Sequence, residues 1–284
     1  MSKKSLKSLA IGISSLVILS FLLPMLFNNL SDPQFNSNKS DDITNETLIE
    51  NYLKSDEAEG CESQEESSIA VSDKSIKVSK RPVTIACVLK SGGDFTKTYV
   101  EKLQRGVKRC FPNINYEFVC LTDRTDIKCC RTIPLINDWP GWWSKIELFR
   151  PGVFEGKVIY FDLDTVLIKN ISELVSVPRK MTMLKAFNPS RHRASGIMIW
   201  KAGDYDFIYK DFLENPCFEG GDQDFIVKKL RRKGGALAVQ RTTSVVSYKH
   251  HCKEGLPANT QIVCFHGQPR PSKVKTDWMK EYWK

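Results

Sequence analysis

The sequence has no internal repeat, no motif of a known nucleic-acid-binding class and no cysteine spacing that matches a zinc site. The first absence excludes a repeat architecture, and the third argues against a structural zinc ion. Charge is also missing over one long stretch near the N-terminus, residues 9–27. What remains is a chain of 284 residues, long enough for one full-sized catalytic domain with appendages.

The uncharged stretch Leu9 to Phe27 is preceded by three lysines. As an α-helix it would span roughly 28 Å, about the thickness of a bilayer core. We predict an uncleaved transmembrane signal-anchor at residues 9–27, because a cleaved signal peptide would have a shorter apolar core and a small-x-small site. The lysines place residues 1–8 in the cytosol and the rest across the membrane, as in a single-pass type II protein.

Residues 28–81 differ in composition from the rest of the chain. They are rich in Ser, Asn, Asp and Glu, with 12 acidic and 6 basic residues and no sustained hydrophobic period. We predict a disordered stem there. Because the whole chain has a net charge of +9, residues 82–284 are more basic still. A basic domain suits an anionic ligand such as a nucleotide sugar, and its scattered bases predict no nucleic-acid partner.

Nine cysteines and three Asn-x-Ser/Thr triplets bear on the compartment. A luminal location permits disulfides, and the odd number leaves at least one thiol free. The triplets begin at Asn38, Asn45 and Asn170 and are potential glycosylation acceptors. With the anchor and stem they favour a membrane protein facing the Golgi lumen, while a bacterial inner membrane or a viral origin remains open.

Strand-like and helix-like segments alternate from residue 82 onward, which predicts an α/β domain with a mostly parallel sheet covered on both faces. Apolar, β-branched runs indicate the strands, and helical periodicity indicates the helices. The expected strands are 83–89, 116–121, 131–135, 157–161, 180–186, 196–200 and 261–265, and the expected helices are 95–109, 144–149, 205–213 and 223–233.

Asp162-Leu163-Asp164 directly follows the predicted strand 157–161. Ligands of open α/β sheets collect outside the carboxyl ends of the strands, so these acids are expected to face a cleft. Two carboxylates separated by one residue repel each other unless a cation joins them. Mg²⁺ and Mn²⁺ prefer oxygen ligands and usually keep substrate phosphates in their shell. The pair therefore predicts a metal held against a diphosphate.

Four further segments stand in a recognisable order around this pair. They are Trp142 to Phe149 before it, then Ser195 to Trp200, Gly221 to Asp224, and Cys264 to Pro271. Together they resemble nucleotide-sugar glycosyltransferases of the GT-A fold, nearest to glycosyltransferase family 8 and its glycogenin-like relatives. The resemblance covers about residues 82–284, and it implies a GT-A, Rossmann-like sheet with flanking helices behind the transmembrane helix.

The resemblance implies that Asp162, Asp164 and His266 hold Mn²⁺ or Mg²⁺ against the diphosphate of the donor. Gly267 would let the backbone approach a phosphate. Arg270 stands where the family usually has a lysine that reaches the diphosphate, and a guanidinium can bind such oxygens bidentately.

The resemblance also implies donor-binding and catalytic residues. Asp222 and Gln223 would lie near the anomeric carbon and stabilise the positive charge that develops there. From its position after two glycines, Asp222 is also expected to cap the helix that begins at Gln223. The remaining donor contacts implied are Cys87, Val88, Lys90, Asp123, Lys145 and Ser195.

The predicted function is metal-dependent transfer of a hexose from a UDP-sugar to a hydroxyl of a glycan, protein or lipid, with retention of configuration implied by the resemblance. Two alternatives stay open. Asp162 to Leu167 also fits the first motif of haloacid-dehalogenase-like phosphatases, with Asp162 as nucleophile and Asp164 as acid/base. The chain could also be an inactive membrane-anchored binding module, because Ala194 replaces an asparagine that the family places at the donor sugar.

Overall fold

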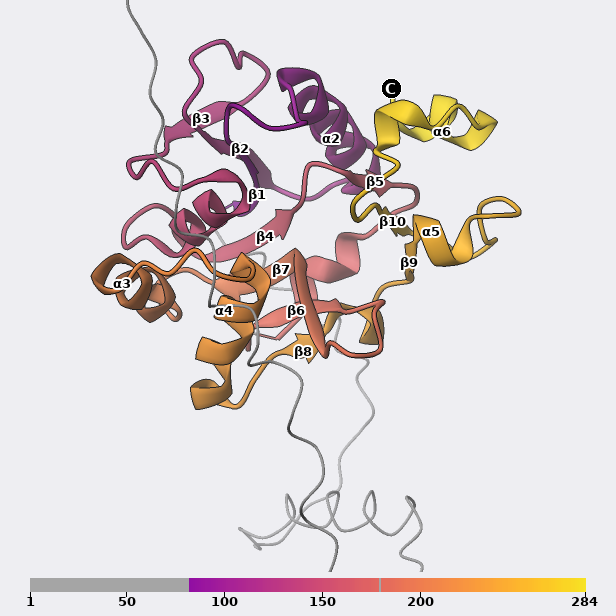
Figure 1. The fold of residues 1–284 in the computed structure, drawn as a ribbon. Coiled ribbons are helices and arrows are strands. Elements are labelled where there is room, and N and C mark those ends of the chain that lie inside the picture. Colours follow the sequence, from indigo (N-terminus) through magenta and orange to yellow (C-terminus); the bar gives the residue numbers. More distant parts are fainter. Residues whose placement is uncertain (1–81, 179) are drawn as a thin grey trace, which may run out of the picture. The chain divides into compact units, whose positions relative to one another are not determined.

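The computed structural model of the protein describes residues 82–178 and 180–284 (Figure 1). The predicted cytosolic tail at 1–8, signal-anchor at 9–27 and stem at 28–81 lie outside the described residues. In the part that is described, no helix combines the length and the apolar character needed to cross a bilayer.

A seven-stranded sheet forms the centre of the described domain, with strand order β3-β2-β1-β4-β7-β6-β8. Its first four strands are mutually parallel, and β7 is antiparallel to both β4 and β6. Since β8 runs parallel to β6, the mostly parallel sheet expected from the sequence is confirmed. The strand bounds are Arg131–Pro134 (β3), Tyr116–Thr122 (β2), Val83–Leu89 (β1), Lys157–Phe161 (β4), Arg193–Lys201 (β7), Thr182–Lys185 (β6) and Leu237–Ala238 (β8).

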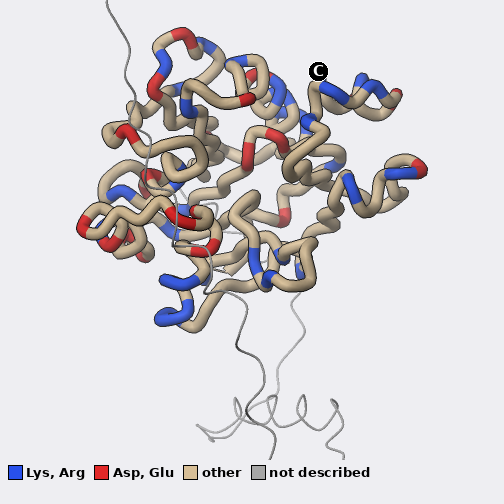
Figure 2. Tube along the Cα trace, viewed as in Figure 1, with Lys and Arg blue, Asp and Glu red and all other residues tan. Residues whose placement is uncertain are grey.

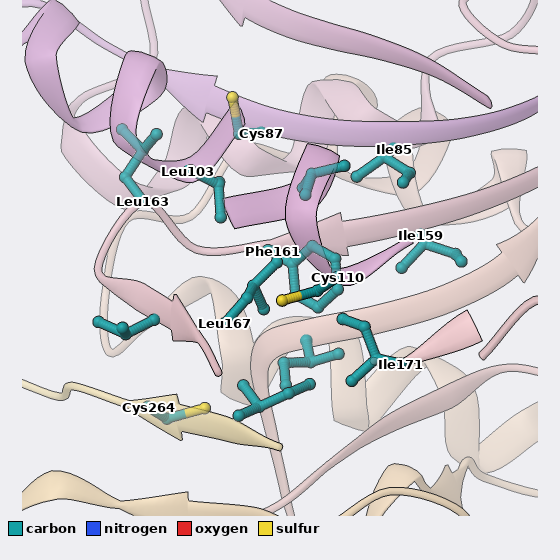
Figure 3. Packing of buried hydrophobic residues seen from close by; sticks show 14 of the residues in the cluster. Ile85, Cys87, Leu103, Cys110, Ile159, Phe161, Leu163, Leu167, Ile171 and Cys264 are labelled. Atoms are coloured by element: carbon teal, nitrogen blue, oxygen red, sulfur yellow. The ribbon is translucent and has the colours of Figure 1, made fainter. Parts of the chain in front are cut away.

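Side chains of the central strands alternate between two apolar cores, one on each face of the sheet. In β4, Ile159 and Phe161 belong to one core, whereas Val158 and Tyr160 belong to the other. Figure 3 shows part of the first core, in which Phe161 and Leu167 lie close to Cys110 of α2. Because both faces are buried, the strands read in the sequence as nearly continuous apolar runs.

The first core is covered by helix α2 (Lys97–Cys110) and a small second sheet. The buried residues of α2 recur three and four positions apart, as in an amphipathic helix. The helix packs directly on the second sheet at Gly106, where a Cβ would make ordinary van der Waals contact with Cβ of Leu167 at 3.5 Å. The second sheet has the order β5-β10-β9, with bounds Thr165–Leu167 (β5), Ile262–Cys264 (β10) and Val245–Ser247 (β9).

The second core is covered by the 3₁₀ helix η2 (Gly141–Phe149) and by α3 (Asp206–Glu214) and α4 (Asp222–Leu230). The sequence predicted an ordinary helix at 144–149, so the segment was located correctly but its winding was not. Residues 143–149 of η2 are all buried. Burying the Glu147 carboxylate is costly unless it has partners, and it accepts hydrogen bonds from the backbone N–H groups of Ile136 and Asn137.

All predicted strands are present, β1 and β4 with the predicted ends and the others with shifted ends, and the helices α2, α3 and α4 are present with shifted ends. The prediction missed several short elements: β5, β8 and β9, the helices α5 (Tyr248–His251) and α6 (Asp277–Tyr282), and the 3₁₀ turns η3 (Ser172–Ser176), η4 (Arg231–Lys233), η5 (Val239–Arg241) and η6 (Pro271–Lys273). Each is too short to give a periodic sequence signal.

Lysine and arginine lie on most elements of the described domain (Figure 2), with a run of three in η4. Cysteines are distributed as widely, and every one that lies within residues 82–178 and 180–284 is a free thiol. Cys61 lies outside these residues.

We expect Phe212→Ala to lower the free energy of unfolding by about 3–5 kcal/mol, because it removes a fully buried ring. That ring stacks on Trp143 with centroids 5.0 Å apart. Urea unfolding monitored by circular dichroism would measure the change. Leu213→Ala, at the next residue of α3, is the matched control. Because the Leu213 side chain is 50% exposed, its removal should change the free energy of unfolding by no more than about 0.5 kcal/mol. Equal effects of the two variants would contradict the packing of α3 described above.

Candidate functional site

The carboxyl ends of β1, β2 and β4 meet at one edge of the main sheet, where polar side chains gather. Beside this edge is a central pocket of about 610 Å³, a size typical of small-molecule sites. It brings together five residues singled out from the sequence: Asp162, Asp164, Ser195, Gln223 and His266. The rest of its lining comes from the β6–β7 loop, α5, the start of β5 and the ends of β6, β7 and β10.

Asp162 is held by its own strand and by β7. The hydroxyl of Tyr160 donates to Oδ1 of Asp162 at 2.5 Å, and the backbone N–H of Asp162 donates to the carbonyl of Gly196 at 2.9 Å. Gly196 also keeps space for the carboxylate, since a Cβ there would lie 3.2 Å from Oδ2 of Asp162. The carboxylate is thus fixed at the edge of the pocket.

Lys145 links this carboxylate to a second one. Its Nζ lies 3.0 Å from Oδ1 of Asp162 and 3.1 Å from Oδ2 of Asp222. Nζ also donates to Oγ of Ser195 at 3.1 Å, and that hydroxyl donates to Asp222 at 2.7 Å. Burial by itself would lower the pKa of Lys145, but the charges of the two aspartates outweigh it and raise the pKa above its ordinary value. The lysine therefore stays a cation at neutral pH.

Asp222 and Gln223 differ in their placement. Gln223 lines the central pocket, whereas Asp222 is 6% exposed and lies behind the wall as a partner of Lys145 and Ser195. The expected cap is also wrong, since Gly221 is the N-cap of α4 and the helix begins at Asp222 itself. The Asp222 side chain bonds to Ser195 of β7 rather than to its own helix.

Asp164 faces the pocket but is 4% exposed. Nη1 of Arg270 lies 2.7 Å from its Oδ2, and Nε of Arg270 lies 3.3 Å from Asp94. Burial and the nearby charge of Asp162 raise the pKa of Asp164 to about 7, although Arg270 opposes the shift. Two carboxylates share this corner of the pocket at an electrostatic cost.

His266 lies at the exposed side of the pocket, beside other rings. Its Nε2 shares a hydrogen bond with Oγ of Ser247 at 2.7 Å, and its ring stacks on Phe187 and on His250, each with centroids 5.7 Å apart. The protein packed around this ring, together with the charges of Lys249 and His250, lowers the pKa of His266. The imidazole is therefore neutral near pH 7, as a metal ligand must be.

The donor set Asp162, Asp164 and His266 suits a divalent cation in type. All three line one pocket, and a cation would relieve the carboxylate repulsion that raises the pKa of Asp164. However, their side chains do not converge on one point. Within residues 82–178 and 180–284, no three His, Cys, Asp or Glu side chains lie close enough together to hold an ion. The metal site stays a prediction.

A second polar cluster lies at the carboxyl ends of β1 and β2. Nζ of Lys90 lies 2.9 Å from Asp123 and 2.7 Å from Asp138, and Ser91 donates to Asp123 through its backbone N–H and its hydroxyl. Burial alone would raise the pKa of Asp123, but the hydrogen bonds from Lys90 and Ser91 outweigh it and lower the pKa to about 2. The predicted nucleoside residues Lys90 and Asp123 therefore contact each other.

The side chains of the other two predicted nucleoside-binding residues pack in the apolar cores. Cys87 is fully buried in the first core (Figure 3), and Val88 packs against the second core. Gly267 and Arg270 lie outside the lining of the central pocket.

Several residues at the site carried no sequence signal. In the sequence, Tyr160 belongs to an apolar strand run, and Phe187, Lys249 and His250 fall in segments without a motif. The structure nevertheless places the last three in the lining of the pocket and the Tyr160 hydroxyl on Asp162. The alternation of buried faces along β4 could have placed the Tyr160 hydroxyl beside Asp162. The positions of the other three depend on how the β6–β7 loop and α5 pack.

No protein-family model matches the chain, and no curated protein sequence is detectably similar. Solved structures do match. The glycosyltransferase GlyE of Streptococcus pneumoniae TIGR4 superposes with a TM-score of 0.52 at 11% identity, covering 71% of this chain and 59% of GlyE. An active-site mutant of LgtC superposes with a TM-score of 0.50 at 12% identity, covering 70% of this chain and 93% of LgtC.

At these identities the likeness concerns the fold alone. The chain has the fold of GT-A-type glycosyltransferases, so that expectation is confirmed. The comparison does not extend to family 8 specifically. The chain spans 59% of the length of the GlyE chain.

Lys145→Met tests the buried ion network. The variant leaves Asp162 and Asp222 without their shared cation, and we expect it to lose about 3–5 kcal/mol of unfolding free energy at pH 7. Because the pKa of Lys145 is raised, its contribution is fully present at neutral pH and is lost only at strongly alkaline pH. Urea unfolding provides the measurement. The control Lys128→Met, at an exposed lysine, should change little; equal losses would exclude the network.

Asp123→Asn tests the second cluster. A lowered carboxyl pKa contributes stability above the ordinary value near 4, and that contribution disappears as the pH falls through about 2. The variant should therefore be about 1 kcal/mol less stable at pH 7, and its difference from the wild type should shrink below about pH 4. Denaturant titrations at several pH values measure this. Asp126→Asn, which changes a carboxylate that is 42% exposed against 21% for Asp123, should show a smaller pH dependence.

Proposed function

We propose that the protein is a metal-dependent glycosyltransferase that transfers a hexose from a UDP-sugar to an acceptor hydroxyl. The observation that carries the proposal is the central pocket at the carboxyl ends of the strands, lined by Asp162, Asp164, Ser195, Gln223 and His266. A pocket of about 610 Å³ has the size of a small-ligand site, and the fold likeness agrees with this chemistry.

Lys145 has a positioning role in this reaction. Since it contacts both Asp162 and Asp222, it holds the expected metal carboxylate and the start of α4 in a set relation. α4 in turn carries Gln223 into the pocket. Movement of one carboxylate would therefore disturb the other.

Gln223 is the group best placed to meet the donor sugar. Its amide oxygen can stabilise the positive charge that develops at the anomeric carbon as the bond to the diphosphate breaks. Asp222 acts behind it through Ser195 and Lys145, and its charge adds to the negative field at the same place. The proposal includes retention of configuration at the anomeric carbon, and this part is supported by the family resemblance alone.

Asp162, Asp164 and His266 would hold Mn²⁺ or Mg²⁺, and the ion would supply positive charge that stabilises the departing diphosphate. The neutral state of His266 keeps a lone pair available for such a bond. Lys90, Asp123 and Ser91 lie at the neighbouring strand ends, where they would bind the nucleoside.

The cellular setting belongs to the proposal as well. A membrane anchor at 9–27 and a stem at 28–81 would hold the domain at the lumenal face of the Golgi as a type II protein, acting on a glycan, protein or lipid. A bacterial inner membrane or a viral origin gives the same topology in another compartment.

Asp164→Asn is expected to reduce Mn²⁺-dependent release of UDP from the preferred UDP-sugar by about 100-fold or more, because it removes one charge from the metal-binding pair. A screen of UDP-sugars with and without Mn²⁺ would identify the donor first, and UDP release would then be assayed for each variant. The matched control is Asp94→Asn, which changes the other carboxylate that contacts Arg270 without touching the pocket, and which should keep its turnover.

The two alternatives predict different outcomes. In the phosphatase, Asp162 must be a free nucleophile, whereas here its Oδ1 is bound by Lys145 and Tyr160; a phosphoenzyme trapped on Asp162 would support that reading and overturn ours. Complete absence of turnover with every UDP-sugar, together with intact UDP binding, would support the inactive binding module.

A further inference from the structure

Lys249 projects into the site from an element that the sequence did not predict. It follows β9 in the short helix α5 and lines the central pocket together with His250 and His266. Its Nζ lies 3.2 Å from the position that a Cβ on Gly267 would occupy. The ammonium is therefore packed against the loop that carries His266.

Gly267 makes this placement possible. Its φ of +74° is in the left-handed region that favours glycine, and a side chain there would press on the Lys249 ammonium. The loop His266-Gly267 thus leaves space for a cation as well as for a ligand.

Lys249 differs from the other cations near the site because its charge is uncommitted. Among residues 82–178 and 180–284, no carboxylate forms an ion pair with Lys249, and no acceptor takes a hydrogen bond from its Nζ. By contrast, Lys145 serves two aspartates and Lys90 two more. A half-buried lysine without an acid partner favours an anion from outside.

Arg270, which the family resemblance assigns to the diphosphate, is committed elsewhere. Its guanidinium binds Asp164 at 2.7 Å and Asp94 at 3.3 Å, and it lies over the ring of Phe95 at 4.7 Å. It is also outside the lining of the central pocket. Binding a diphosphate would cost Arg270 these contacts, whereas Lys249 would give up no ion pair or hydrogen bond to the described residues.

We propose that Lys249 is a phosphate-binding residue of this chain, whose ammonium binds the diphosphate of the nucleotide donor beside His266 and Gly267. The proposal rests on the proposed function for the donor class and adds a residue to it. In this arrangement Lys249 neutralises the leaving group directly, and Arg270 screens the buried Asp164.

Lys249 also borders a second cavity of about 720 Å³, which we call the C-terminal cleft. This cleft is lined by α5, by the loop that follows it and by the start of α6, with Lys253 and Trp278 in its wall. Lys253 lines the C-terminal cleft but not the central pocket. It has the same charge, lies four residues away and is exposed, so it is a matched control.

The proposal is tested by isothermal titration calorimetry of the full-length protein in the presence of Mn²⁺. UDP affinity is measured directly, and uridine affinity is measured by its competition with UDP. Lys249→Ala should weaken UDP binding about tenfold, with uridine affinity unchanged, since uridine has no phosphate. Lys249→Arg should restore most of the UDP affinity, and Lys253→Ala should bind both ligands like the wild type.

The outcomes separate this proposal from the function on which it rests. If the wild type binds UDP and Lys249→Ala binds it equally well, the role of Lys249 is overturned and the proposed function stays intact. Equal weakening of UDP and uridine would also overturn it, because the lysine would then act on the shape of the pocket. Failure of the wild type to bind UDP would overturn the proposed function itself, and the role of Lys249 with it.

Discussion

One buried ammonium connects the parts of this site. Lys145 of η2 binds Asp162 at the end of β4, Asp222 at the start of α4 and Ser195 of β7. A buried cation is stable only with paired charges and satisfied hydrogen bonds. The four elements therefore cannot shift independently, and the wall of the central pocket is set by a charge balance as well as by apolar packing.

The burial of η2 is the structural condition for that balance. Its aromatic residues pack with α3 in the second core, where Trp143 stacks on Phe212. The two charged residues that this packing buries, Lys145 and Glu147, each have several partners. Stability and site geometry thus share the same helix, so substitutions in the second core should also affect the pocket.

Charges at the other end of the pocket are less balanced. Asp164 is buried close to the charge of Asp162, and Arg270 only partly compensates. Lys249 lies nearby without an acid partner among the described residues. A metal–diphosphate ligand would supply the charges of both signs that this end is missing. The site is thus pre-organised around Lys145, whereas the charges of Asp164 and Lys249 are left for a ligand to balance.

The sequence by itself determined six of the seven strands of the main sheet, because strands buried on both faces are written as apolar runs, and it placed Asp162 and Asp164 at the end of such a strand. It could not determine η2 as a 3₁₀ helix or the short elements β9 and α5, whose local signal is weak. Tertiary structure alone decided that Asp222 lies behind the pocket wall, that Arg270 binds Asp164, and that Lys249 reaches His266. The physical reason is that these contacts join residues far apart in the chain, so they depend on the packing of whole elements and leave no trace in local composition or spacing.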